Sequence, residues 1–490
     1  MLLLLLFLFV TACSGQNEDK EHGSWSIPRT KITEEEPKME QKIERQTRCG
    51  TVCGLDMGDY ETYLGIPYAT ARRWERAVLT EHWDDAYDAT GFGDRACQFR
   101  GFYGTENSGI NQFYYDEAIA PIPAEYSEDC LNLNIWTPKD AKNLPVLVFI
   151  HGGAFLTGGN GEPFIDGAAY TQNGVILVSI NYRMGPFATA YGDGYTGNYA
   201  LTDQVTALTW IKKYIADFGG DPDRITIMGE SAGAISVQNL IVSPLSEGLF
   251  CGAIMMSGGG DLTTLGTPVT PEKVEPIWEL LKERKGVDHL QDLKDIPAAS
   301  LYAAWQMVLS ELPQYASTAA NPVVDGNILP STVKTAQTEG KLADVPCIFG
   351  ILSEDMWPHT LYTSAMAYAV NQSKSNGQPV YMYYFDRQLP GENRFGAFHA
   401  ADLWYMFGTL GRNWRPFEEV DFRISENMIQ YVSNFVKNGD PNGTGLPKWE
   451  PVTQKQQLCL HLGDQVPEMM APDIQKLYET QQLCPAFPYK

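Results

Sequence analysis

Basic residues are scarce in this sequence. It has 36 Lys and Arg against 60 Asp and Glu over 490 residues, which gives a net charge of −24. Binding to nucleic acid needs a basic surface that faces the phosphates, and binding to anionic lipid needs a polybasic patch. We therefore expect no nucleic-acid partner and no electrostatic attachment to a membrane. A solvated acidic surface is typical of an exported protein.

Cysteine is also scarce, with nine in the chain. That density is too low for a fold stapled by disulfides. Cys251 and Cys347 lie in apolar runs and are expected to be buried thiols. The spacing of Cys49 and Cys53 is only weakly like a metal or redox site, because no histidine or second cysteine pair is near, so no metal is expected. The sequence leaves open the pairing of Cys49, Cys53, Cys459 and Cys484.

Long apolar runs are missing except at the start of the chain. That run is about ten residues, too short to span a bilayer and suitable for a signal peptide. It ends in small residues before Cys13, which resembles a bacterial lipobox whose cysteine is lipidated, although no Lys or Arg precedes the run. Residues 1–13 are thus expected to direct export to the cell envelope as a lipoprotein. The alternative is an ordinary signal peptide with a chance cysteine and a periplasmic or secreted product.

Residues 14–45 are polar and charged and are expected to form a flexible tether. Residues 46–490 are expected to form one globular domain without internal repeats. Within it, short apolar runs suited to buried strands alternate with helical patterns such as Leu201–Phe218, which predicts an α/β fold with a mainly parallel sheet. A helix-rich insertion at about 265–335 is expected over the sheet, where lids and pockets tend to lie. The predicted strands are Val146–Ile150, Val175–Ile180, Ile225–Met228, Ala253–Met256, Cys347–Ile351 and Val380–Phe385.

A G-x-S-x-G pentapeptide follows one of these strands, in Gly229-Glu-Ser-Ala-Gly-Ala234. The two glycines permit a tight turn from strand to helix that projects the Ser231 hydroxyl, as in a nucleophile elbow. A serine alcohol is a weak nucleophile, so it needs a base, a group that orients the base, and donors for an oxyanion. The backbone N–H groups of Gly152 and Gly153, which follow another strand, and of Ala232 are the predicted donors.

The base must come from seven histidines. In this fold class the order along the chain is serine, acid, histidine, which leaves His359, His399 and His461. His461 lies inside a strand-like run and His359 follows a proline next to the acid candidates, so His399 is the predicted base. Glu354 and Asp355 follow a strand and are the acid candidates. Adjacent side chains point in different directions, and local features do not choose between the two.

These motifs together resemble the type-B carboxylesterase/lipase family, which includes cholinesterases and bacterial carboxylesterases. The resemblance extends in order over roughly residues 46–460. Besides the serine motif it rests on Tyr63–Ala69, Ser127–Trp136, His151–Phe155, Asn181–Gly185, Gly197–Gln204, Phe218–Arg224, Pro322–Gly326 and Asn438–Asn442.

The resemblance implies an α/β-hydrolase fold with Ser231 as nucleophile and His399 as base. It places the triad acid at Asp355, where the family usually has Glu, and Met356 replaces the usual glycine. It puts Glu230 near the histidine. It also implies a disulfide between Cys97 and Cys130 near the active-site entrance. Arg183 and Asp203 lie in structural motifs and are expected to hold the fold together.

The implied activity is hydrolysis of small-molecule carboxylic esters through an acyl-enzyme, with no metal or organic cofactor. One alternative is a lipase for longer-chain lipids, and another is a non-catalytic adhesion module of the kind found among cholinesterase relatives. Neither the ester nor the oligomeric state follows from the sequence.

Overall fold

The structure is a computed structural model that describes residues 41–98, 117, 125–261, 267–375, 377–391 and 395–483. The expected signal peptide with Cys13, most of the expected tether, and Cys484 lie outside the described residues. Residues 41–45, assigned above to the tether, instead begin strand β1 (Gln41–Thr47), which pairs antiparallel with β2 (Gly50–Asp56). Arg45 fixes this strand by binding Tyr63 and Glu61. None of the helices within the described ranges has the length and apolar character needed to cross a bilayer.

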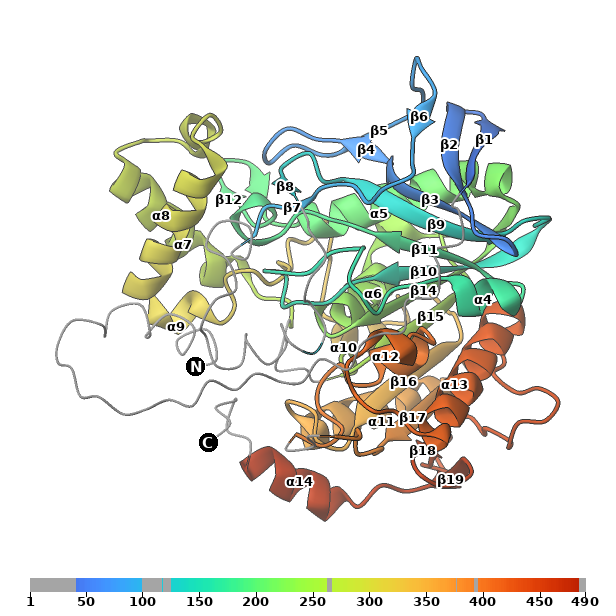
Figure 1. The fold of residues 1–490 in the computed structure, drawn as a ribbon. Coiled ribbons are helices and arrows are strands. Elements are labelled where there is room, and N and C mark those ends of the chain that lie inside the picture. Colours follow the sequence, from blue (N-terminus) through green and yellow to red (C-terminus); the bar gives the residue numbers. More distant parts are fainter. Residues whose placement is uncertain are drawn as a thin grey trace, which may run out of the picture.

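A large twisted sheet forms the centre of the molecule (Figure 1). Its parallel part contains every strand predicted from the sequence, in the spatial order β11-β10-β14-β15-β16-β17, with β18 added at the end. Their bounds are β10 Leu144–Ile150, β11 Ile176–Ile180, β14 Gly220–Glu230, β15 Gly252–Met256, β16 Cys347–Leu352, β17 Val380–Phe385 and β18 Cys459–Leu462. The predicted α/β architecture is confirmed.

Antiparallel strands extend both ends of this sheet. At one end β11 pairs with β9 (Asn132–Pro138), followed by β3 (Tyr60–Pro67), β2 and β1. At the other end β19 (Glu468–Met470) pairs with β18. Strands β9 and β3 were not predicted, because buried polar residues such as Asn134 and Glu61 interrupt their apolar pattern.

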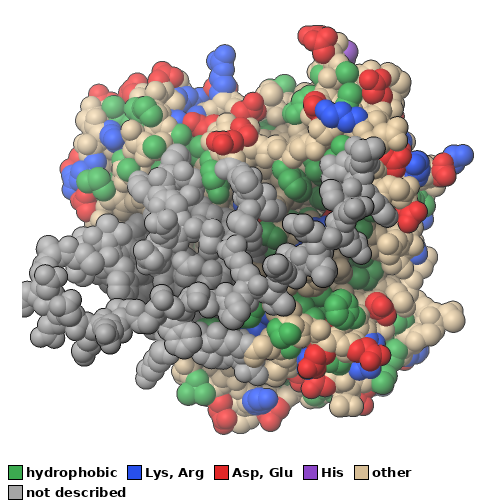
Figure 2. Space-filling view, viewed as in Figure 1, with side chains coloured by type: hydrophobic (Ala, Val, Ile, Leu, Met, Phe, Trp, Pro, Cys, Tyr) green, Lys and Arg blue, Asp and Glu red, His purple; other side chains and the backbone are tan. Residues whose placement is uncertain are grey.

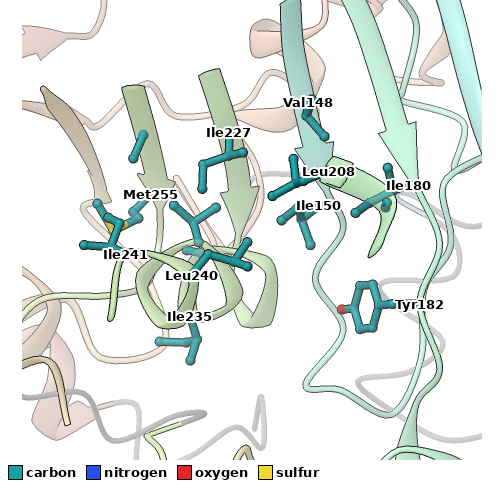
Figure 3. Packing of buried hydrophobic residues seen from close by; sticks show 14 of the residues in the cluster. Val148, Ile150, Ile180, Tyr182, Leu208, Ile227, Ile235, Leu240, Ile241 and Met255 are labelled. Carbon is teal, nitrogen blue, oxygen red and sulfur yellow. The ribbon is translucent and has the colours of Figure 1, made fainter. Parts of the chain in front are cut away.

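Helices cover both faces, and β10 shows the division. Val148 and Ile150 face a core shared with α5 (Tyr199–Tyr214), α6 (Ala232–Val242) and α11 (Pro358–Lys374), whereas Leu147 and Phe149 face a second core shared with α13 (Glu419–Asn438). Side chains of a strand alternate between faces, so one apolar run fills both cores. Figure 3 shows strand residues packed against Leu240 and Ile241 of α6.

Most of the helices inserted between β15 and β16 pack around a separate apolar core, built on Trp74, Trp278 and Trp305. They group beside β12 (Tyr191–Gly192) at one end of the molecule rather than lying across a sheet face (Figure 1). Leu156, in the loop after β10, packs against both this core and the main core. The helices of this group are α7 Pro271–Lys285, α8 Ala298–Glu311 and α9 Pro313–Ala316. The fourth inserted helix, α10 Val333–Thr338, lies apart from them and packs on α6 and α11 in the main core.

Acidic and basic side chains are interspersed over the described part of the face in Figure 2. Inside the molecule, by contrast, some ion pairs are almost fully enclosed, and the pair of Arg183 with Asp203 is one of them. Arg183 donates from Nη2 and Nε to the Asp203 carboxylate at 2.6 and 2.8 Å, and their side chains are 3% and 0% exposed. The pair ties the loop after β11 to α5, in the structural role expected for it.

Breaking this pair should destabilise the fold. Asp203→Ala leaves the Arg183 guanidinium buried without its counter-charge, so we expect the free energy of unfolding to fall by about 3–5 kcal/mol. Denaturant unfolding measures the change. Lys42→Ala is the control, because the pair between Lys42 and Asp88 lies in solvent and should contribute little. Equal stability of Asp203→Ala and Lys42→Ala would contradict the expectation.

Candidate active site

Ser231 lies on the turn between the end of β14 and the start of α6. Its φ of 56° is in the left-handed region, which is unusual for a residue other than glycine. The flanking glycines are required by close contacts: a Cβ at Gly229 would lie 2.3 Å from the backbone of Gly233, and one at Gly233 would lie 2.0 Å from the Ile150 oxygen. The Ser231 N–H donates to Met256 O at 2.9 Å. The predicted elbow is therefore present in the backbone.

The glycine loop after β10 lies directly against this turn. A Cβ at Gly152 would lie 2.7 Å from the Glu230 oxygen and 3.0 Å from the Ser231 Cβ, so only glycine fits. Gly153 has φ of 107°. Within the described part of the chain, no group accepts a hydrogen bond from the backbone N–H of Gly152, Gly153 or Ala232. The structure thus brings Gly152 directly against the serine turn.

Gln98 holds the far side of this loop and was missed in the sequence. Its side chain is fully buried, accepts from the Gly158 N–H at 3.0 Å and from the Thr157 hydroxyl at 2.7 Å, and donates to Gly158 O at 2.8 Å. One amide thus satisfies both backbone groups of Gly158. In the sequence, the only hint of this role is that Gln98 is an amide residue next to Cys97, in the segment before the family motif Ser127–Trp136.

His399 follows β17 in a loop, and its Nδ1 lies 2.7 Å from Asp355 Oδ1. Its Nε2 lies 3.2 Å from Glu230 Oε1. Glu354, the other acid candidate, points away and accepts the Ala397 N–H at 3.0 Å. The side chains of His399 and Asp355 are 7% and 0% exposed, so this contact is sheltered from water.

Ser231, His399 and Asp355 line one cavity. The other histidines that the chain order allowed lie elsewhere: His359 packs against Tyr478, and His461 Nε2 lies 2.7 Å from Asp386. The remaining lining residues are largely apolar or small, namely Ile235, Ser257, Gly258, Met356, Trp357 and Leu361.

Three buried carboxyl groups surround the His399 ring. Burial raises the pKa of Glu230, and the His399 charge opposes that rise. Burial also raises the pKa of Asp402, against the hydrogen bond of 2.6 Å that Tyr383 donates to it. For His399 burial lowers the pKa, but the charges of Glu230 and Asp355 outweigh burial and the pKa rises. The acidic groups beside the ring therefore favour its protonated, imidazolium form.

Asp402 was not identified from the sequence. It lies three residues after His399, at the end of the turn that precedes α12 (Leu403–Met406), so the two remain close in space. Its short separation from His399 was the feature of the sequence that could have indicated a place in the site. Among the described residues, no group of three or more His, Cys, Asp or Glu side chains could hold a metal ion.

The expected disulfide between Cys97 and Cys130 needs correction, because both are free thiols. Cys97 lies near the segment that carries Cys130, since its N–H donates to Ser127 O at 3.2 Å. However, the two side chains pack into different apolar clusters, Cys97 with Trp74 and Cys130 with the main core. Burial raises the pKa of each thiol, which favours the protonated form.

Several known proteins are similar to this chain. A family model described as "Carboxylesterase family" matches residues 41–364 and 354–482. The para-nitrobenzyl esterase of Bacillus subtilis (strain 168) is 29% identical over 88% of this chain and 96% of its own length. The bile salt-activated lipase of Rattus norvegicus is 30% identical over 83% of this chain and 78% of its own.

Among solved structures, the carboxylesterase EST55 of Geobacillus stearothermophilus at pH 6.2 is similar with a TM-score of 0.73 and 29% identity, over 90% of this chain and all of that one. These matches confirm the α/β-hydrolase fold and the enzyme class expected from the sequence, and they favour neither a binding module nor an adhesion role. The chain belongs to the carboxylesterase family.

Proposed function

We propose that this carboxylesterase cleaves small-molecule carboxylic esters through a Ser-His-Asp triad of Ser231, His399 and Asp355, by way of a covalent acyl-enzyme. The observation that carries the proposal is the cavity that these three side chains share, with Nδ1 of the histidine bound at 2.7 Å to the acid. The names of the relatives, esterases and a lipase, support ester chemistry.

In the proposed reaction, Nδ1 is held by Asp355, so Nε2 is the nitrogen that moves protons. It takes the proton of the Ser231 hydroxyl while the oxygen bonds to the ester carbonyl carbon. The N–H groups of Gly152, Gly153 and Ala232 bind the oxyanion. The C–O bond to the alcohol then breaks, and the alcohol leaves with the proton from Nε2. Water repeats the sequence on the acyl-enzyme and releases the acid.

Glu230 lies on the opposite side of the His399 ring from Asp355 and assists the same reaction. Its Oε1 lies 3.2 Å from Nε2, close enough to stabilise the imidazolium formed when Ser231 loses its proton. Asp355 stabilises the same charge through Nδ1. The imidazolium therefore lies between two carboxyl groups, only one of which orients the ring for proton transfer.

Ser231→Ala should abolish turnover of a p-nitrophenyl ester, lowering kcat by about 10⁴-fold or more, because the nucleophile is lost while the cavity stays. Initial rates on p-nitrophenyl butyrate measure this loss. Ser300→Ala, a change on the exposed side of α8, is the matched control and should leave kcat unchanged. Wild-type turnover by Ser231→Ala would refute the nucleophile assignment, as would organophosphonate labelling of that variant at the wild-type rate.

The two acid candidates can be separated by isosteric changes. Asp355→Asn keeps the shape but removes the charge that fixes the His399 tautomer, so kcat should fall by about 10³–10⁴-fold. Glu354→Gln should retain kcat within about 3-fold, because its side chain does not face the imidazole. Parallel kcat measurements at one pH test the pair. A greater loss in Glu354→Gln than in Asp355→Asn would reverse the assignment.

Glu230→Gln should move the acid limb of the kcat/KM profile to lower pH. His399 acts as a base only when neutral, so activity rises as pH increases through its pKa. Glu230 raises that pKa, and removing its charge lowers the pH at which the base becomes neutral. A pH profile on one ester measures the shift, with the exposed Glu247→Gln as control. An acid limb that moves to higher pH would show that Glu230 does not act by its charge on His399.

A further inference from the structure

Glu354, the carboxylate beside the proposed triad acid, has no place in the reaction described above. We propose that Glu354 is a positioning residue that clamps the loop carrying His399, and so holds the imidazole at bonding distance from Asp355. This inference rests on the proposed triad, since it concerns how the base is held.

The clamp consists of two reciprocal hydrogen bonds with Ala397, two residues before His399. The Glu354 N–H donates to Ala397 O at 3.2 Å, and the Ala397 N–H donates to Glu354 Oε2 at 3.0 Å. Glu354 also forms a single parallel bridge with Phe398. Backbone and side chain of one residue therefore bind both polar backbone groups of another, which fixes the separation and the orientation of the two segments.

The same carboxylate ties in two further elements. It accepts from the Ser353 hydroxyl and from Gln388 Nε2, which lies 3.3 and 3.4 Å from its two oxygens. Ser353 extends β16 and Gln388 follows β17, so the ends of two neighbouring strands and the His399 loop meet at one acceptor group. A carboxylate suits this position because it accepts several hydrogen bonds and donates none.

The loop is built to approach this carboxylate closely. A Cβ at Gly396 would lie 2.8 Å from the Glu354 carboxyl carbon, and Gly396 has φ of 60°, so only glycine allows the contact without strain. On the other side of His399, Ala400 has φ of 72°. A non-glycine residue in that region persists only where surrounding contacts hold it. The His399 loop therefore depends on external anchors, and Glu354 supplies one on its N-terminal side.

The side chains of Glu354 and Asp355 point in different directions, so the two carboxylates have different roles. At the end of β16, Asp355 turns to Nδ1 of His399 and Glu354 turns to the backbone of Ala397. One carboxylate binds the ring and the next binds the loop that carries the ring. Because a misplacement of about 1 Å can cost about 100-fold in rate, loosening the loop should slow the chemistry without removing a reacting group.

The test compares Glu354→Ala, Glu354→Asp and Glu354→Gln in the full chain. Active sites are counted by titration with a p-nitrophenyl organophosphonate, and kcat and KM on p-nitrophenyl butyrate are expressed per titrated site, well below the unfolding temperature. Glu354→Ala should lower kcat about 10- to 100-fold with KM within about 3-fold. Glu354→Asp keeps the charge but is one methylene too short to reach Ala397, and should also lower kcat. Glu354→Gln keeps length and one acceptor oxygen and should restore kcat to within about 3-fold.

A purely structural role would lower the unfolding temperature and the number of titrated sites while kcat per site stayed at the wild-type value, and that result in Glu354→Ala and Glu354→Asp would overturn the inference. Equal loss in Glu354→Gln and Glu354→Ala would overturn it too, because charge rather than reach would then matter. The triad is judged separately: if Asp355→Asn is inactive while Glu354→Ala is fully active, only the positioning inference fails. Full turnover by Asp355→Asn would instead remove the triad on which the inference rests.

Discussion

The backbone turn at Ser231 is the constraint on which the rest of the site depends. A left-handed conformation at a serine costs about 1–3 kcal/mol, so neighbouring structure must hold it. The register of β10 with β14, which pairs Ile150 with Gly229, supplies that hold, together with the contact of Gly233 on the Ile150 oxygen. Since β10 and β14 are adjacent and parallel, their following loops leave at the same edge of the sheet. The serine turn and the glycine loop after β10 therefore meet because of the strand order, before any side chain is considered.

The sequence predicted the parts of the fold whose signal is local. Continuous apolar runs such as Val380–Phe385 are buried on both faces, and they marked the parallel strands almost residue by residue. Strands that carry buried polar residues were missed. In β9, Asn134 donates to Asn160 O and Ser179 Oγ and accepts from the Gly65 N–H, so its burial depends on partners far away in the chain. Hydrophobic periodicity along the sequence does not reveal such distant partners, and for this reason the antiparallel end of the sheet was not predicted.

The same division applies to the site. Ser231, His399 and the glycine loop were predictable because each follows a strand and carries a distinct residue type. The choice between Glu354 and Asp355 was not local, because it depends on which side of the β16 end the His399 loop passes. Gln98 and Asp402 gain their importance only from burial next to the site, and neither residue type is distinctive in a sequence. The disulfide inferred from family resemblance was wrong for a related reason: nearness in the fold does not bring two sulfurs into the same packing cluster.

The carboxyl groups around His399 present an electrostatic problem that the structure resolves by unequal environments. Glu230, Asp355 and Asp402 are all buried near one imidazole, and three full negative charges there would repel one another strongly. Burial pushes the pKa of Glu230 and of Asp402 upward, so these two are readily protonated. Asp355, bonded to Nδ1 at 2.7 Å, keeps the closest interaction with the ring. A base held too firmly as an imidazolium could not accept a proton from serine. Glu230 ionises reluctantly, so it stabilises the imidazolium of His399 once that charge forms, but it holds the charge less firmly when the neutral base is needed. This balance suits the proposed role of His399, which must gain and lose the same proton in every turnover.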